Sequence, residues 1–326
     1  MNFYSIVARL RICLLALACF GVLPDAYAGN YPDHAIHIVV PLPPGASVDA
    51  LARVLAGPLG DRLKQPIVID NKPGGNMIIA AQAVAQSPPD GYTLFLTMDL
   101  PLVANPFLYT RLSYDAENDF TAISLLATSP MLIAVGSQLQ KKSIQDFLAY
   151  AKGNPGKLSY GGGVVAAQVV GENLRRDAGI DMVYVPFRGG SPVIQALLGG
   201  TISLSITDIT PALPWIRNGR LTALGVTGSH RDPSLPNVPT LVEEGHKDMD
   251  ITNWIGLVAP AKTPEAIVKR LNEELVGIMS RPEIRKKILE LTLDPMTSSP
   301  AEMTDRIKLD RSKWGKIIRA SGVTIN

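Results

Sequence analysis

Cysteine is almost absent from this sequence of 326 residues. Cys13 and Cys19, its two cysteines, both lie near the N-terminus, so the rest of the chain has no disulfide, thiolate nucleophile or cysteine-based metal site. A strong net charge is lacking too, because 31 Lys and Arg residues nearly balance 29 Asp and Glu residues. The resulting formal charge of +2 gives no indication of a nucleic-acid partner, and we expect none.

The motifs of the common enzyme classes are also missing. None of the four histidines forms a His-x-x-x-His pair, and the sequence contains neither Gly-x-Ser-x-Gly nor a Walker loop. The run Gly161-Gly162-Gly163 lacks the spacing of a dinucleotide-binding loop. We therefore predict that the protein is not an enzyme, and that it has no catalytic residues, no metal site and no cofactor.

The N-terminal segment has the three parts of a secretory signal peptide. Arg9 and Arg11 precede an apolar stretch, residues 12–23, that is too short to span a bilayer, and Ala26-Tyr27-Ala28 fits a cleavage site. We predict a signal peptide over 1–28, cleaved after Ala28, and a soluble periplasmic protein. The alternative is lipidation at Cys19, although the large Leu17 fits a lipobox poorly.

After the signal peptide, short β-branched runs alternate with helical patterns, which predicts parallel sheets flanked by helices. We expect strands at 36–40, 66–70, 92–97, 158–160, 182–185, 202–207 and 221–227. We expect helices at 48–63, 77–86, 143–152, 165–177, 192–199 and 212–218, and three more that begin near residues 263, 282 and 299. Residues 105–119 are expected to be irregular.

Four loops rich in glycine or proline join expected strands to expected helices. They cover residues 41–47, 71–76, 161–163 and 187–192. The first turn of a helix has unpaired N–H groups at the positive end of its dipole, where anions bind. Glycine turns of this kind can also serve geometry alone. Four in one chain, at strand ends that converge, indicate a shared site for an acidic ligand.

Two sequence features predict how the chain is divided. The apolar stretch 122–135 is interrupted by Ser129-Pro130, where we place a first crossing between lobes, and residues 253–259 are expected to return. We predict one lobe from 29–127 and 248–326, and a second from 128–247. Two lobes joined by two crossings form a hinged cleft.

The same segments resemble the Bug-type periplasmic receptors of tripartite tricarboxylate transporters. The similarity covers nearly the whole mature chain, in order. The matching segments include Val39-Val40-Pro41-Leu42-Pro43-Pro44-Gly45 with Asp49, Asp70-Asn71-Lys72-Pro73-Gly74, Pro89-Asp90-Gly91-Tyr92-Thr93-Leu94, Asn154-Pro155-Gly156-Lys157-Leu158, Val185-Pro186-Phe187-Arg188-Gly189, Leu235-Pro236-Asn237-Val238-Pro239-Thr240 and Lys313-Trp314.

This resemblance implies a two-lobed α/β fold of the periplasmic-binding-protein kind (Venus flytrap, type II), with a mainly parallel sheet in each lobe. It implies a receptor that captures a small carboxylate and delivers it to the membrane permease subunits of a tripartite tricarboxylate-type transporter. We expect a monomer. The implied binding residues are Leu42, Pro44, Gly45, Ala46, Ser47, Gly74, Gly75, Asn76, Gly162, Gly163, Gly189, Gly190, Ser191 and Asp208.

The chain departs from the family pattern at several of these positions. Leu42 stands where an aromatic residue is usual, Ala46 replaces a glycine, and Gln168 lies near a usual histidine. The loop 161–167 is short and mostly apolar, so we expect a ligand less polar than citrate, or a changed ligand. Asp49 is expected to be structural, and Arg188 is the one basic residue beside the glycines of its loop.

Two other functions remain open from the sequence. A receptor of this kind can pass its signal to a sensor protein rather than to a permease, and no residue pattern separates these roles. An exported enzyme on the same fold would need a histidine or paired carboxylates in the cleft, and the sequence gives no sign of such a set.

We predict that the exported protein begins at Gly29, because the cleavage site ends at Ala28. Intact-mass spectrometry of protein purified from the periplasm should give the mass of residues 29–326. A diacylglyceryl group on Cys19 would contradict this prediction.

Overall fold

The computed structural model of the chain describes residues 31–325. The predicted signal peptide lies outside the described residues. Among residues 31–325, none of the helices combines the length and the apolar character needed to cross a bilayer.

Within this part of the chain, ten strands form a mixed sheet in the order β2-β1-β3-β9-β4-β7-β5-β6, and β8 and β10 also pair with β4. Parallel pairing joins β1 to β2 and β3, and joins β5 to β6 and β7, as the alternation of strands and helices predicts. The strands are β1 (Ile36–Val40), β2 (Ile67–Asn71), β3 (Thr93–Met98), β4 (Phe120–Gly136), β5 (Leu158–Gly162), β6 (Met182–Pro186), β7 (Leu204–Asp208), β8 (Leu221–Val226), β9 (Thr252–Pro260) and β10 (Asp294–Pro295).

The long strand β4 belongs to both parts of the sheet. Its residues 120–130 pair with β9, and its residues 131–136 pair with β7 and β8. The apolar stretch 122–135 lies in one continuous strand, and β4 passes through Ser129 and Pro130 without a break. Proline cannot donate to a strand ladder, but Pro130 lies where β4 changes partners, so little pairing is lost.

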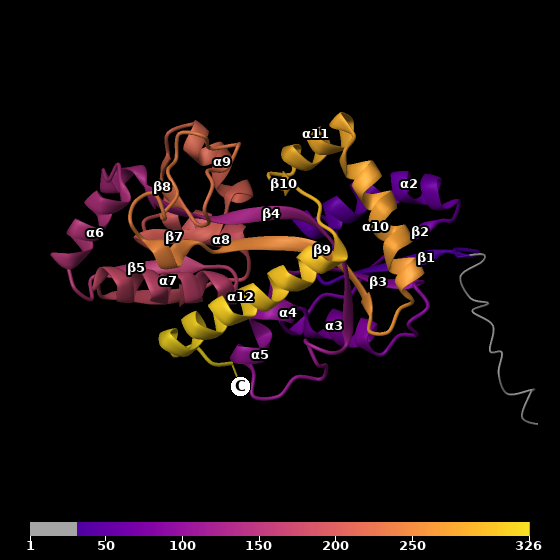
Figure 1. Cartoon of the computed structure of the whole chain (residues 1–326). Coiled ribbons are helices and arrows are strands. Elements are labelled where there is room, and N and C mark those ends of the chain that lie inside the picture. The colour runs from indigo at the N-terminus through magenta and orange to yellow at the C-terminus, as the bar shows by residue number, and fades with distance from the viewer. Residues whose placement is uncertain (1–30, 326) are drawn as a thin grey trace, which may run out of the picture.

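Helices cover both faces of the sheet (Figure 1). One core lies under α2, α10 and α11, a second under α8 and α9, and a third is shared by α3, α4, α6, α7 and α12. The helices are α2 (Ser47–Leu63), α3 (Ile78–Ala85), α4 (Asp99–Val103), α5 (Asn105–Leu108), α6 (Ile144–Lys152), α7 (Val165–Ala178), α8 (Gly190–Leu198), α9 (Ile209–Arg217), α10 (Glu265–Met279), α11 (Pro282–Glu290) and α12 (Pro300–Ser321), with short 3-10 turns at η1 (Gly75–Met77), η2 (Ser137–Leu139) and η3 (Lys247–Met249).

Three expectations about local structure need correction. The region 105–119 is not wholly irregular, because it begins with α5, and the unpredicted helix α4 precedes it. The glycines Gly161 and Gly162 lie inside β5 rather than in a loop, where pairing with β6 and β7 extends the strand. The helix α8 starts at Gly190, two residues before Pro192.

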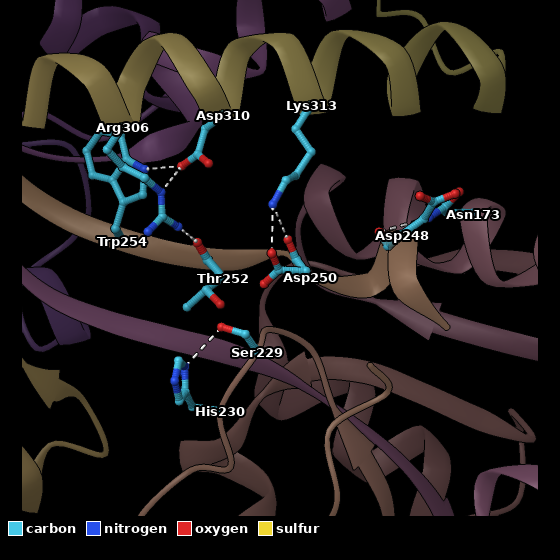
Figure 2. Close-up of polar contacts among 10 residues, drawn as sticks. All are labelled: Asn173, Ser229, His230, Asp248, Asp250, Thr252, Trp254, Arg306, Asp310 and Lys313. Carbon is cyan, nitrogen blue, oxygen red and sulfur yellow. Dashed lines mark hydrogen bonds and ion pairs between the residues drawn. The ribbon is translucent and has the colours of Figure 1, made fainter. Parts of the chain in front are cut away.

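The long helix α12 fixes the segment through which the chain returns into β9. As Figure 2 shows, Lys313 donates to the carbonyl oxygen and the carboxylate of Asp250, at 2.9 Å each. One turn away, Asp310 accepts hydrogen bonds from the indole N–H of Trp254 (3.0 Å) and from Arg306 (2.6 Å). The start of β9, beside the partner change of β4, is therefore tied to one rigid helix.

We predict that Gly171→Ala lowers the free energy of unfolding by about 1–3 kcal/mol. A Cβ atom at Gly171 in α7 would lie 2.0 Å from the ring of Tyr160, which is held by its hydroxyl hydrogen bond to Glu172. The matched control is Gly277→Ala in α10, where the nearest atom would be an ordinary 3.5 Å away.

The control should be neutral or stabilising by about 0.5–1 kcal/mol, because alanine favours the helix. Urea unfolding monitored by circular dichroism measures both changes. Equal effects of the two substitutions would contradict the close packing of α7 on β5.

Candidate ligand-binding site

The loop between β1 and α2 is braced by a buried carboxylate. The N–H group of Gly45, which has a φ of +87°, donates to Asp49 at 2.8 Å. Arg53 donates to both carboxylate oxygens of Asp49, and Asn71 donates to one of them. These hydrogen bonds, that of Arg53 above all, lower the pKa of Asp49 to about 2. The expectation that Asp49 is structural is confirmed.

Because Asp49 occupies the N–H of Gly45, the donors available at this loop lie further along the chain. The first backbone N–H bonded back along α2 is that of Ala50, which donates to Ala46. The N–H groups of Ser47, Val48 and Asp49 have no acceptor among the described residues, and Ala46 provides no side-chain cap. An open helix start therefore faces the end of β1.

The loop after β2 has an unusual backbone. Gly74, Gly75, Asn76 and Met77 all have positive φ values, a conformation that is costly for the last two. Polar contacts hold it: the side-chain amide of Asn76 donates to the Tyr109 hydroxyl, and the backbone carbonyl oxygen of Asn76 accepts a hydrogen bond from the side chain of Asn105 at 3.0 Å. One of the two side-chain N–H groups of Asn76 is thus already engaged.

The loops after β5 and β6 touch each other. The carbonyl oxygen of Gly162 accepts the N–H of Phe187 at 3.0 Å, and that of Gly163 accepts the N–H of Gly189 at 3.2 Å. A Cβ atom at Gly163 would lie 2.4 Å from the backbone of Gly189. Only glycine therefore permits this approach at position 163. A Cβ atom at Gly190 would in turn meet the buried hydroxyl of Thr207 at 2.7 Å, so the end of β7 joins the group.

Three helices start at these loops without side-chain caps. They are α7 after Val164, α8 after Gly189 and α9 after Asp208. Among the described α-helices, only α6 and α12 have side-chain caps, from Ser143 and Ser299, the latter in the predicted capping box. Uncapped starts leave N–H donors and the positive end of each helix dipole available to an anion.

The side chain of Asp208 has no hydrogen-bond partner among residues 31–325, although it is only partly exposed at the end of β7. Burial raises its pKa above the ordinary value for a carboxyl group. When it is protonated, this carboxyl group can donate a hydrogen bond, as a ligand carboxylate requires.

The loop side chains that stay unpaired complete the chemistry of the site. Lys72 and Arg188 are exposed, and the side chain of neither forms a hydrogen bond or ion pair with a described residue. The hydroxyl groups of Ser47 and Ser191 also lack partners within residues 31–325. Each loop group therefore provides one exposed cation and one hydroxyl beside its helix starts.

The predicted binding residues fall into two groups. Leu42, whose carbonyl oxygen accepts a hydrogen bond from Asn71, belongs with the exposed Pro44 to the group after β1 and β2. The group after β5, β6 and β7 contains the other predicted residues of that part of the chain: Gly162, Gly163, Gly189, Gly190, Ser191 and Asp208. Among the described residues, no hydrogen bond or ion pair links one group to the other.

A profile of one protein family matches most of the chain. The family is TctC, the tripartite tricarboxylate transporter family receptor, and its profile matches residues 51–323. The chain belongs to this family. The resemblance found in the sequence is therefore confirmed.

Individual relatives are similar to this chain over all or most of its length. The chain is 29% identical to Protein BugT of Bordetella pertussis over 330 residues, which cover 100% of both chains. Among solved structures, it is similar to Rhodopseudomonas palustris Rpa4515 with adipate (TM-score 0.80, 29% identity, 90% and 99% of the two chains). It is also similar to MatC from that organism with bound malate (TM-score 0.76, 29% identity, 88% and 100%).

These findings decide the class of the protein. The TctC family consists of periplasmic solute-binding receptors with a two-lobed fold, and not of enzymes, as predicted. The parallel strand sets are joined by antiparallel strands, so the sheet as a whole is mixed. The lobe boundaries and the individual binding residues stay predictions.

Three residues that hold the loops of the candidate site in place were not predicted from the sequence. Asn71 ties the first two loops together, Tyr109 engages Asn76, and Thr207 lies under Gly190. A signal existed only for Asn71, which lies inside a matching segment. Tyr109 and Thr207 are distant in sequence from the residues they contact.

We predict that Asp49→Ala lowers the free energy of unfolding by roughly 2–4 kcal/mol at pH 7, because it removes several hydrogen bonds to a buried carboxylate. The control is Asp61→Ala on the same helix, an exposed residue that should change stability by less than about 0.5 kcal/mol.

The pH dependence has a defined sign. The pKa of Asp49 is lower in the folded state, so its stabilisation is present above its ordinary value of 3.8 and is lost as the pH falls toward 2. The stability gap between wild type and Asp49→Ala, measured by urea unfolding, should narrow over this interval. A gap independent of pH would contradict the role of the charge.

Proposed function

We propose that this receptor captures a small organic acid between its two loop groups in the periplasm and delivers it to the permease of a tripartite tricarboxylate-type transporter. The observation that carries the proposal is the set of uncapped helix starts at α2, α7, α8 and α9. They provide anion-binding donors at the ends of strands from both parts of the sheet.

Backbone donors can hold a carboxylate without a buried cation. Each hydrogen bond to a charged oxygen contributes about 1.5–3 kcal/mol, so a few of them account for useful affinity. The cations at hand, Lys72 and Arg188, are exposed, and they attract the acid without the desolvation cost of a buried ion pair.

Similar proteins support the choice of ligand class. The solved relatives Rpa4515 and MatC hold adipate and malate, both small dicarboxylates. Because the present chain has the same fold over about nine tenths of its length, a dicarboxylate of this size is the first ligand to test.

The lack of bonds between the loop groups supports a closing movement. A ligand that reaches both groups would bridge them and favour the closed arrangement. The segment held by α12 at Asp250 and Trp254 is where the chain returns between the predicted lobes, so we place the hinge beside it.

We predict that dicarboxylate binding tightens as the pH is lowered toward the raised pKa of Asp208. Because burial raises this pKa, Asp208 becomes protonated at a higher pH than an exposed carboxyl group does, and protonated Asp208 donates to the anion instead of repelling it. Isothermal titration calorimetry with succinate or adipate measures the change.

Asp208→Asn should remove most of this pH dependence, because an amide donates at every pH. Asp305→Asn on the exposed surface of α12 is the control and should behave as wild type. Binding that tightens equally in Asp208→Asn would contradict the position of Asp208 at the ligand. Absence of binding by any small carboxylate would refute the proposed function.

A further inference from the structure

We propose that the acid taken by this site has an unsubstituted hydrocarbon body, without hydroxyl or amino groups, and that Ile79 and Val164 select it. This inference rests on the proposed function and narrows its substrate class. The observation behind it is the apolar surface that each loop group presents.

Two large aliphatic side chains are exposed at the candidate loops. Ile79 is 52% exposed and Val164 is 43% exposed, although such residues are usually buried. Ile79 lies over the second loop, because its Cδ1 atom is 2.8 Å from the position of a Cβ atom on Gly74. Val164 follows Gly163 and directly precedes α7.

The two side chains belong to helix starts in the same layer of the molecule. Helices α3 and α7 contribute to one shared core, and Ile78 and Val165, the neighbours of the exposed pair, pack against it. Figure 1 shows both helices on the same side of β4 and β9. A ligand that bridges the loop groups on this side meets an aliphatic surface from each of them.

Polar side chains that could receive a ligand hydroxyl are scarce here. One side-chain N–H of Asn76 donates to Tyr109, and Thr207 lies beneath Gly190. The free hydroxyls of Ser47 and Ser191 stand at the starts of α2 and α8, where the carboxylates are expected. The starts of α3 and α7 present only Ile, Val, Ala and Met side chains over residues 77–80 and 164–167.

This composition discriminates between acids through hydration. Methylene groups gain free energy when they leave water against Ile79 and Val164. A ligand hydroxyl in the same place loses its hydrogen bonds to water and finds no replacement. The site should therefore favour plain aliphatic carboxylates over hydroxy acids of equal length.

The test compares succinate with malate, which differ by one hydroxyl group, in calorimetric titrations of the mature protein. Adipate and citrate extend the series in length and polarity. We expect succinate to bind roughly 10- to 100-fold more tightly than malate, the range typical of an apolar pocket that excludes a hydroxyl. We expect adipate to bind at least as tightly as succinate, and citrate weakly.

Threonine variants, of which Val164→Thr is nearly isosteric, assign the effect to the two side chains. Ile79→Thr and Val164→Thr each place a hydroxyl at the site and should reduce the succinate-to-malate ratio several-fold, mainly by tightening malate binding. The matched control is Val183→Thr on β6, a residue that is 56% exposed and outside the loops, and its ratio should equal that of wild type. Thermal unfolding verifies that each variant is folded.

The outcomes separate the two levels of the proposal. Malate binding as tightly as succinate would overturn the hydrocarbon selectivity while leaving a carboxylate receptor intact. A ratio that both threonine variants leave unchanged would overturn the assignment to Ile79 and Val164. If none of the four acids bound, the proposed function itself would fail, and this inference with it.

Discussion

The structure depends on helix starts whose N–H groups are left unpaired where strands end. Such donors need loops that bring the backbone close, which is why Gly45 and Gly189 have positive φ values and Gly163 lies against Gly189. The first loop is stabilised by Asp49, a buried carboxylate that binds Gly45, Arg53 and Asn71 together. Because these hydrogen bonds fix the loop at the start of α2, the unpaired N–H groups there are held in place before a ligand binds.

This arrangement separates affinity from selectivity. Backbone donors recognise any carboxylate, and they do not change when side chains mutate. The side chains around them, such as Leu42, Ile79 and Val164, can then vary to suit the body of the ligand. In this chain they are aliphatic, whereas the solved relatives of similar fold hold both adipate and the hydroxy acid malate. Helix α12 binds Asp250 and Trp254 and so fixes the segment that leads into β9, beside which we propose the hinge.

The features that depend on local sequence periodicity, such as strands and the loops after them, were predicted from the sequence. The bounds of β1 were predicted to the residue, and the loops before α2 and α8 were recognised from their glycines. Features set by distant contacts were not predictable. Strand β4 continues through Pro130 because its partners change there, and Asn76 keeps a left-handed backbone because Tyr109 and Asn105 hold it. Gly45 was expected among the binding residues, but its N–H donates to the carboxylate of Asp49.

The central claim is that the acid is held by backbone N–H groups at helix starts. A crystal structure of the receptor with its bound acid tests this claim most directly. The account predicts carboxylate oxygens within about 2.7–3.2 Å of N–H groups at the starts of α2 and α8, with Lys72 and Arg188 further away or linked through water. A carboxylate paired directly with Arg188, and without contact to either helix start, would contradict it.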